Sequence, residues 1–219
     1  MDYRLLGFFS GFPDRNFPHE IAERLRDELL KRDSIVFISA WPADYERNDI
    51  DSTNMHGLFE EYNIPFTKHY VIDNRVDASH AARLIYEASC LFLMGGYPKL
   101  QLELIHNRNL DIVIRNADAA VLGLSAGSIN MAKNSLDTKE SHIPYDGLCL
   151  ADITVKPHFE AENQQVLSIL LEISMGLPIC AMEDNSAIFV AGDHISYTGL
   201  IHWVNKGKIC PFQVESLSL

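Results

Sequence analysis

The fold of this chain is decided by the stretch Ala120-Val121-Leu122-Gly123-Leu124-Ser125-Ala126-Gly127-Ser128-Ile129-Asn130. Apolar residues lead into the pattern Gly-x-Ser-x-Gly, which predicts a buried strand, a sharp turn that carries Ser125, and the start of a helix. Such a turn needs small residues around the serine, because larger side chains would collide with the neighbouring backbone. The turn also exposes the hydroxyl near the positive end of a helix. Ser125 is therefore the candidate nucleophile, and an ordinary glycine-rich turn is the alternative.

Predicted strands and helices alternate along the rest of the chain. Apolar runs predict strands, and apolar residues at helical spacing predict helices. The strands are expected at residues 5–9, 34–39, 66–72, 90–94 and 179–182, and the helices at 19–32, 78–88 and 165–173. A strand, a helix and a second strand in this order imply a right-handed crossover and a parallel sheet. Residues 187–190 and 194–198 predict an antiparallel hairpin that closes an α/β fold, and we expect one domain over residues 1–219.

Two polar stretches are predicted to be loops beside the carboxyl ends of strands. Residues 41–54 contain Pro42 and several polar side chains, and a helix is expected only from residue 55. Ligands bind at this edge of open parallel sheets, so three residues here are candidate pocket residues, with a solvated connection as the alternative. They are Trp41, Asp44 and Tyr45. Residues 135–147 form the second loop, where substrate contacts are expected.

The composition limits the partners and the compartment. Eighteen Lys and Arg against 30 Asp and Glu give a net charge of −12, which argues against a nucleic acid or an anionic membrane as partner. The four scattered cysteines form no C-x-x-C pair, so we expect reduced core thiols and no metal site. They are Cys90, Cys149, Cys180 and Cys210. The five apolar residues 5–9 are too few for a signal peptide or a membrane span, and we expect a cytoplasmic protein. A homodimer is considered alongside a monomer.

A serine nucleophile needs a base, and the base needs a carboxylate. A neutral imidazole is the usual base, and His158 follows a short predicted strand and a proline that place it at the sheet edge of Ser125. A carboxylate must then hold the imidazole in the correct tautomer, and Glu183 and Asp184 both close the next strand. Two carboxylates that precede the histidine are reserve candidates: Asp146 and Asp152. An α/β-hydrolase type of esterase would instead use Asp184 with His202.

Backbone N–H groups are the candidate oxyanion hole. The residue after the nucleophile, Ala126, supplies one N–H in this kind of turn. A loop that contains Gly95 and Gly96 follows the predicted strand at residues 90–94 and allows close approach of a second N–H. The alternative for these glycines is a tight turn without a ligand.

Four segments together resemble the peptidase E family of serine peptidases, relatives of aspartyl dipeptidase and cyanophycinase. They are Gly-Leu-Ser-Ala-Gly at 123–127, the glycine pair at 95–96, Lys-Pro-His-Phe at 156–159 and the acid at 183. The resemblance covers most of the chain. It implies a three-layer, mostly parallel, flavodoxin-like sheet related to class I glutamine amidotransferases, here with a C-terminal β-hairpin.

The resemblance also implies roles for five residues. Ser125 is similar to the family nucleophile, His158 to its base and Glu183 to its orienting acid, and the backbone of Gly96 and Ala126 to its oxyanion hole. Such a mechanism needs no metal and no organic cofactor.

Two departures from the family pattern bear on the substrate. Tyr97 follows the glycine pair where aspartyl dipeptidases of the family typically carry Asn. An aspartate side chain calls for an arginine, yet residues 159–173 contain no Arg or Lys, so aspartyl specificity is not expected. We expect a serine hydrolase that cleaves small peptides or related amides through an acyl-enzyme on Ser125. The alternative is a non-catalytic protein that binds a small metabolite on the same fold.

Overall fold

A seven-stranded sheet forms the centre of the molecule in the computed structural model, which describes residues 4–137 and 142–217. The strand order is β11-β10-β1-β5-β4-β2-β3. Five of these strands are parallel: β1 (Leu5–Phe9), β2 (Ser34–Ile38), β3 (Lys68–Ile72), β4 (Cys90–Leu93) and β5 (Ala120–Leu124). The remaining two form an antiparallel hairpin at one edge: β10 (Ala187–Ala191) and β11 (His194–Thr198). The predicted parallel α/β sheet and the hairpin at residues 187–198 are confirmed.

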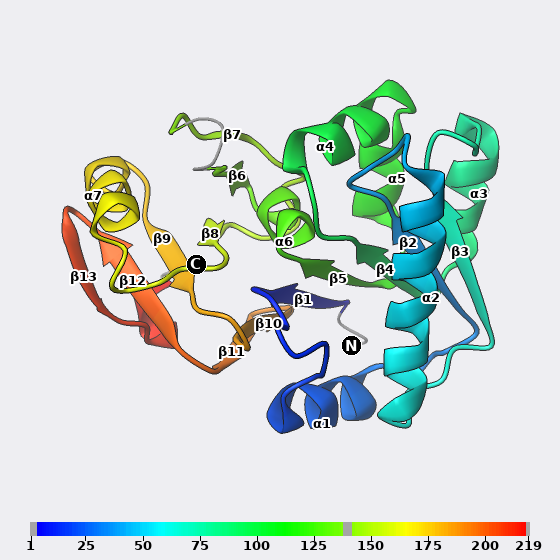
Figure 1. Cartoon of the computed structure of the whole chain (residues 1–219), viewed down its shortest axis with the longest axis horizontal. Coiled ribbons are helices and arrows are strands. Elements are labelled where there is room, and N and C mark those ends of the chain that lie inside the picture. The colour runs from blue at the N-terminus through cyan, green and yellow to red at the C-terminus, as the bar shows by residue number, and fades with distance from the viewer. Residues whose placement is uncertain (1–3, 138–141, 218–219) are drawn as a thin grey trace.

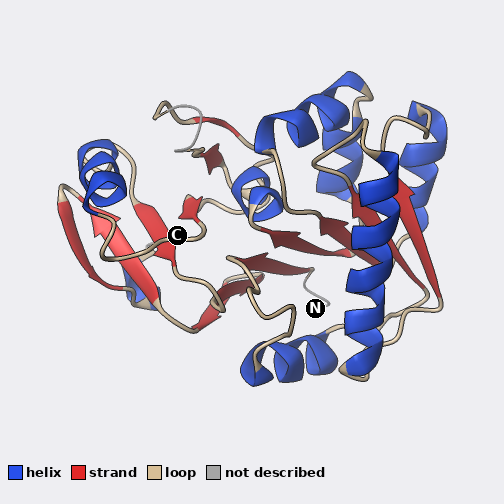
Figure 2. Cartoon of the chain, viewed as in Figure 1, coloured by secondary structure: helices blue, strands red, loops and turns tan. Residues whose placement is uncertain are grey.

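Helices cover both faces of this sheet and make three layers (Figure 1, Figure 2). The sheet-covering helices are α1 (His19–Glu28), α2 (Tyr45–Glu61), α3 (Ala78–Glu87), α4 (Pro98–Asn107) and α5 (Leu110–Asn116). Successive residues of a strand point to opposite faces, so β2 divides its side chains between two cores. Ile35 and Phe37 pack in the core with α1 and α2, and Val36 and Ile38 pack in the core with α3, α4 and α5. The apolar runs in the sequence are therefore strands buried on both faces.

A second, four-stranded sheet lies beside the main sheet, where Figure 1 shows it on the left in yellow to red. Its order is β13-β12-β9-β8, and its strands are β8 (Val155–Lys156), β9 (Ile179–Met182), β12 (Ile201–Asn205) and β13 (Lys208–Pro211). Helix α7 (Gln164–Ile173) packs on it through Leu170, which shares a core with Ile179 and Val204. β12 and β13 were not predicted from the sequence. Their turn at Lys206 and Gly207 has positive φ values of 49° and 70°, a conformation typical of tight hairpins.

The expectation of a loop over residues 41–54 is wrong, because α2 begins at Tyr45. The carboxylate of Asp44 caps this helix by accepting a hydrogen bond from the N–H of Arg47 at 3.3 Å. The buried face of α2 includes the polar residues Asn48 and Ser52, so the helix lacks the apolar periodicity that would have predicted it.

The remaining short elements belong to neither of these two sheets. They are α6 (Ala126–Met131), β6 (Asn134–Ser135), β7 (Tyr145–Asp146) and the 3-10 helix η1 (Val214–Ser216). β6 and β7 pair within the predicted loop at 135–147, of which residues 138–141 lie outside the described residues. Within the described ranges, no helix has the length and apolar character needed to cross a bilayer.

The prediction that all four cysteines are core residues is correct for two of them. Cys90 and Cys180 are buried, whereas Cys149 and Cys210 are exposed, and all four thiols are free.

Candidate active site

Ser125 occupies a strained turn between β5 and α6. Its φ is 51° and its ψ is −104°, outside the usual regions for a residue with a side chain. A Cβ at Gly123 would lie 2.6 Å from the carbonyl carbon of Gly127, and one at Gly127 would lie 2.7 Å from the carbonyl carbon of Leu93. The N–H of Ser125 donates to the carbonyl of Phe9 at 2.9 Å, which ties the turn to β1. The small residues predicted around the serine are therefore required by close backbone contacts.

Two hydrogen bonds join Ser125, His158 and Asp184 into a chain. The Oγ of Ser125 lies 2.8 Å from Nε2 of His158, and Nδ1 of the same ring lies 2.7 Å from Oδ1 of Asp184. A carboxylate accepts hydrogen bonds, so this arrangement suits a neutral ring with its proton on Nδ1 and a lone pair on Nε2 facing the hydroxyl. His158 follows β8, and Asp184 follows β9, so the small sheet carries both partners of the serine.

The structure corrects the expectation that Glu183 contacts His158. Oε1 of Glu183 lies 2.7 Å from Nε2 of His202 on β12, and Asp184 occupies the place beside His158. The reason is local: the N–H of Glu183 donates to the carbonyl of Leu200 at 3.0 Å, so this residue still follows the small sheet. Asp184 is the first residue beyond that contact. Asp184 and His202, the pair expected of an α/β-hydrolase type of esterase, are not hydrogen-bonded to each other among the described residues.

The reserve carboxylates lie elsewhere in the described structure. Asp152 pairs with Lys133 at 2.9 Å, and Asp146 lies on β7. Neither forms a hydrogen bond with His158 among the described residues. The described part of the chain also contains no group of three or more His, Cys, Asp or Glu side chains placed to hold a metal ion.

The two candidate oxyanion-hole residues line one cavity of about 370 Å³ together with Ser125 and His158. Ala126 is the first residue of α6, so its N–H has no intrahelical acceptor. Gly96 has a φ of 142°, and a Cβ there would lie 2.7 Å from Cδ1 of Trp41. Only glycine readily adopts this conformation. Within the described ranges neither N–H is engaged by another group of the protein, so both remain able to donate to a ligand.

The rest of the cavity wall combines apolar and charged side chains. Its other residues are Trp41, Tyr97, Pro98, Ile129, Leu136, Asp137, Lys156 and Pro157. The rings of Trp41 and Tyr97 meet edge to face, with centroids 4.7 Å apart. Asp137 and Lys156 are both largely buried. Of the three pocket residues predicted after β2, Trp41 lines this cavity, whereas Asp44 and Tyr45 line a neighbouring cavity of about 790 Å³ that also includes Trp41.

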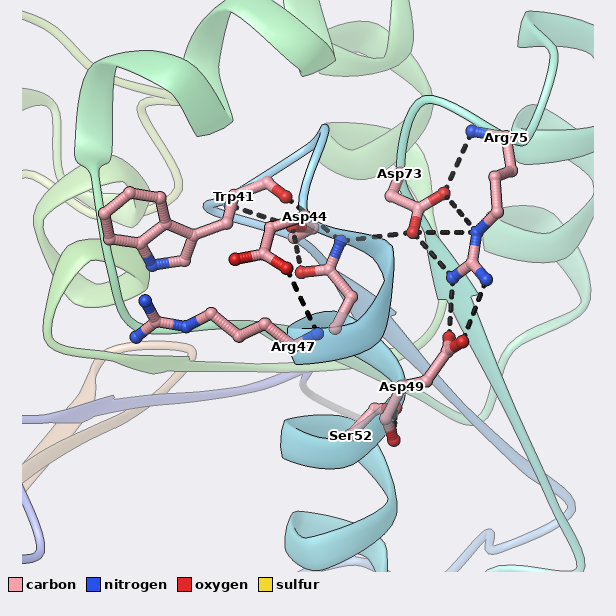
Figure 3. Close-up of polar contacts among 9 residues, drawn as sticks. Trp41, Asp44, Arg47, Asp49, Ser52, Asp73 and Arg75 are labelled. Atoms are coloured by element: carbon pink, nitrogen blue, oxygen red, sulfur yellow. Dashed lines mark hydrogen bonds and ion pairs between the residues drawn. The ribbon is translucent and has the colours of Figure 1, made fainter.

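A polar network fixes the loop that carries Trp41 (Figure 3). The side-chain amide of Asn48 donates to the carbonyl of Trp41 at 3.0 Å and to the buried carboxylate of Asp73 at 3.1 Å. Arg75 binds the same carboxylate at 2.7 Å and also Asp49, and its hydrogen bonds hold the pKa of Asp49 below the ordinary value. Arg47 lies with its guanidinium carbon 4.5 Å from the centre of the Trp41 ring. The backbone of Trp41 is therefore fixed by a hydrogen bond from Asn48, and one face of its ring contacts the guanidinium group of Arg47.

Comparisons with known proteins show what this chain is similar to in sequence and in fold. The model of peptidase family S51 matches residues 9–198 of the chain. Among solved structures, a peptidase from an acI-B1 Actinobacterium is similar with a TM-score of 0.73 and 15% identity, over 96% of this chain and 98% of that one. A protein named for peptidase E, from Listeria monocytogenes EGD-e, is similar with a TM-score of 0.65 and 15% identity, over 90% of this chain and 99% of that one. No curated protein matches the chain.

Proposed function

Because this chain belongs to peptidase family S51, we propose that it is a serine-type peptidase that cleaves small peptides or related amides through an acyl-enzyme on Ser125. The proposal is carried by one observation, the hydrogen-bonded chain from Ser125 through His158 to Asp184, with distances of 2.8 and 2.7 Å. This is the arrangement in which an imidazole can take a proton from a hydroxyl while a carboxylate stabilises the resulting cation.

In the acylation step, Oγ of Ser125 attacks the carbonyl carbon of the scissile amide, and Nε2 of His158 takes the hydroxyl proton. The carbonyl oxygen becomes an oxyanion, to which the N–H groups of Gly96 and Ala126 donate. The C–N bond then breaks, and His158 returns the proton to the leaving amine. Asp184 keeps the imidazole oriented throughout and remains ionised.

In the deacylation step, a water molecule takes the place of the amine. His158 removes a proton from this water, whose oxygen attacks the acyl carbon, and the same two N–H groups bind the second oxyanion. Collapse breaks the bond to Oγ, and His158 returns the proton to Ser125. The cycle consumes one water and releases an amine and a carboxylic acid.

The cavity wall supports a substrate class that is not restricted to acidic residues. Helix α7 and the segment before it carry no Arg or Lys between residues 159 and 173. The cavity contains Lys156 but also Asp137, so its charged side chains have both signs. An acidic side chain would need a fixed excess of positive charge there. Trp41 and Tyr97 instead offer aromatic surface to an apolar or aromatic side chain.

The test is intact-mass spectrometry after incubation with a fluorophosphonate, which adds covalently to an activated serine. Wild type, Ser125→Ala and His158→Ala are compared. We expect one adduct on the wild type, none on Ser125→Ala, and a rate lowered by about 10³-fold or more on His158→Ala. A library of short peptides then identifies the residues accepted on each side of the cleaved bond.

A wild type that gives no adduct, with the probe shown to react with an ordinary serine hydrolase in the same buffer, contradicts the proposal. The same holds for an adduct that survives in Ser125→Ala. A metabolite-binding screen on the wild type would then test the non-catalytic alternative.

A further inference from the structure

Gly11, in the loop that follows β1, lies directly against the His158–Asp184 pair. A Cβ built at Gly11 would be 2.5 Å from Oδ1 of Asp184 and 2.8 Å from Nδ1 of His158, and closer still to Cε1 of that ring. Contacts under 3.0 Å require one partner to move. The two atoms that would have to move are the two ends of the hydrogen bond that orients the imidazole. A side chain at this position therefore requires His158, Asp184 or the backbone of Gly11 to shift.

Ser10, the residue before it, is completely buried and contacts three segments of the site. Its Oγ accepts a hydrogen bond from the backbone N–H of His158 at 2.8 Å and donates to the carbonyl of Met182 at 3.0 Å. Oδ1 of Asp184 lies 3.4 Å from the same hydroxyl. One hydroxyl thus joins the backbone of the base to the strand end that carries the acid.

The backbone of these two residues also holds the turn on which Asp184 lies. The N–H of Ser10 donates to the carbonyl of Ser186 at 3.1 Å, and the N–H of Asn185 donates to the carbonyl of Gly11 at 2.8 Å. β1 belongs to the main sheet, whereas His158 and Asp184 follow strands of the small sheet. Ser10 and Gly11 therefore form one point at which the main sheet, which carries Ser125, is fixed to the segments that carry its two partners.

His158 needs this support because its backbone has a φ of 52°. A residue with a side chain occupies this left-handed region only where surrounding contacts hold it there. The hydrogen bond from its N–H to Ser10 is such a contact, and it fixes the direction in which the ring leaves the backbone.

We propose that Ser10 and Gly11 are positioning residues for the peptidase reaction: the Ser10 hydroxyl fixes the backbone of His158, and the absence of a side chain at Gly11 leaves room for the His158–Asp184 hydrogen bond. This inference rests on the proposed function of Ser125 and His158. It adds two residues that touch no substrate and act through the imidazole.

The first test compares Gly11→Ala with Gly57→Ala. A Cβ at Gly57 on α2 meets no atom within 4 Å, so this control adds the same methyl group at a harmless position. We expect the rate of fluorophosphonate addition to Ser125 to fall about 100-fold in Gly11→Ala, since a displacement of about 1 Å in a reacting group has that effect. Gly57→Ala should keep the wild-type rate.

The second test compares Ser10→Ala with Ser52→Ala. Ser52 is also buried, and its hydroxyl donates to one backbone carbonyl on α2, that of Asp49 at 3.2 Å. We expect Ser10→Ala to lower the rate about tenfold, as for the loss of one hydrogen bond to a buried group, and Ser52→Ala to leave it unchanged. Melting temperatures of both variants show whether the effect is only one of stability. Ser10→Cys, which keeps a weak donor and acceptor, should recover part of the rate.

A readout that does not depend on turnover separates this inference from the proposed function. Nitrogen-15 NMR of labelled histidine reports which ring nitrogen of His158 carries the proton, with His158→Ala used to assign the signal. Gly11→Ala should lose the Nδ1–H form that wild type and Gly57→Ala show. If wild type is not labelled by the probe but Gly11→Ala alone changes the spectrum, the positioning role stands and the peptidase mechanism fails.

Wild-type rate and wild-type spectrum in Gly11→Ala overturn the role of Gly11. If Gly11→Ala does not fold, Ser10→Ala decides: a loss of rate at unchanged melting temperature supports the inference, and wild-type rate with wild-type spectrum overturns it.

Discussion

The sharpest prediction concerns the two neighbouring acids, of which the structure places only Asp184 beside His158. Asp184→Asn keeps the size of the side chain but removes its charge and presents either an oxygen or an amide to Nδ1 of the ring. In the proposed mechanism, the imidazolium that forms during acylation then lacks its counter-ion, and the ring can adopt the wrong tautomer. We expect acylation of Ser125 to slow strongly without loss of the fold.

The magnitude follows from the geometry. His158 Nδ1 and Asp184 Oδ1 are 2.7 Å apart, and the two side chains are 40% and 38% exposed, so the pair is neither fully solvated nor dry. Two unit charges about 4 Å apart attract by about 4 kcal/mol at an effective dielectric constant of about 20. At about 1.4 kcal/mol per tenfold change, this corresponds to about 10³-fold in rate. A wrong tautomer would extend the loss toward about 10⁴-fold.

Glu183→Gln is the matched control, because it makes the same change one residue earlier. The glutamine can still accept the hydrogen bond from His202, and Glu183 makes no hydrogen bond to His158 among the described residues. We expect its effect on the acylation rate to stay within about tenfold. The assay is the second-order rate of fluorophosphonate addition, followed by intact mass. A large loss in Glu183→Gln together with a small loss in Asp184→Asn would refute the assignment of Asp184 as the orienting acid.

Three further predictions test the surroundings of the site. Gly96→Ala should lower the acylation rate about 10²-fold, because a Cβ at that position would displace the proposed oxyanion donor; the same probe measures it. Asp73→Ala should lower the free energy of unfolding in urea by about 1–3 kcal/mol, since Arg75 and a buried amide lose their acceptor. Partial desolvation and the charge of His56 lower the pKa of the exposed His69, against the opposing charge of Glu60. The unfolded chain then binds this proton at a higher pH than the folded chain, so stability falls as the pH drops through about 6.5, and His69→Gln should flatten that fall in urea midpoints.

The parallel sheet could be predicted from sequence because its strands carry their signal locally. The five residues of β1 and the first residues of the 120–124 strand are apolar runs, and such runs are typical of strands buried on both faces. Local sequence does not predict an element whose structure depends on a residue far along the chain. Helix α2 buries Asn48, whose amide is satisfied by Asp73 on another loop, so no apolar periodicity marks the buried face. β12 and β13 lack the alternation of buried and exposed residues that marks a half-buried strand: the buried residues of β12 are three apart, and β13 is exposed throughout.

In the active site, too, some residues could be predicted from local sequence and others could not. Ser125 and the glycines around it belong to one continuous stretch, so backbone sterics within that stretch are enough to predict the elbow. The choice between Glu183 and Asp184 depends instead on where β9 ends, and that end is set by a hydrogen bond to the carbonyl of Leu200, just before β12. A carboxylate one residue earlier faces His202 of the small sheet, and one residue later it faces His158. Because adjacent side chains near a strand end point in different directions, the acid could be assigned only once β12 was located.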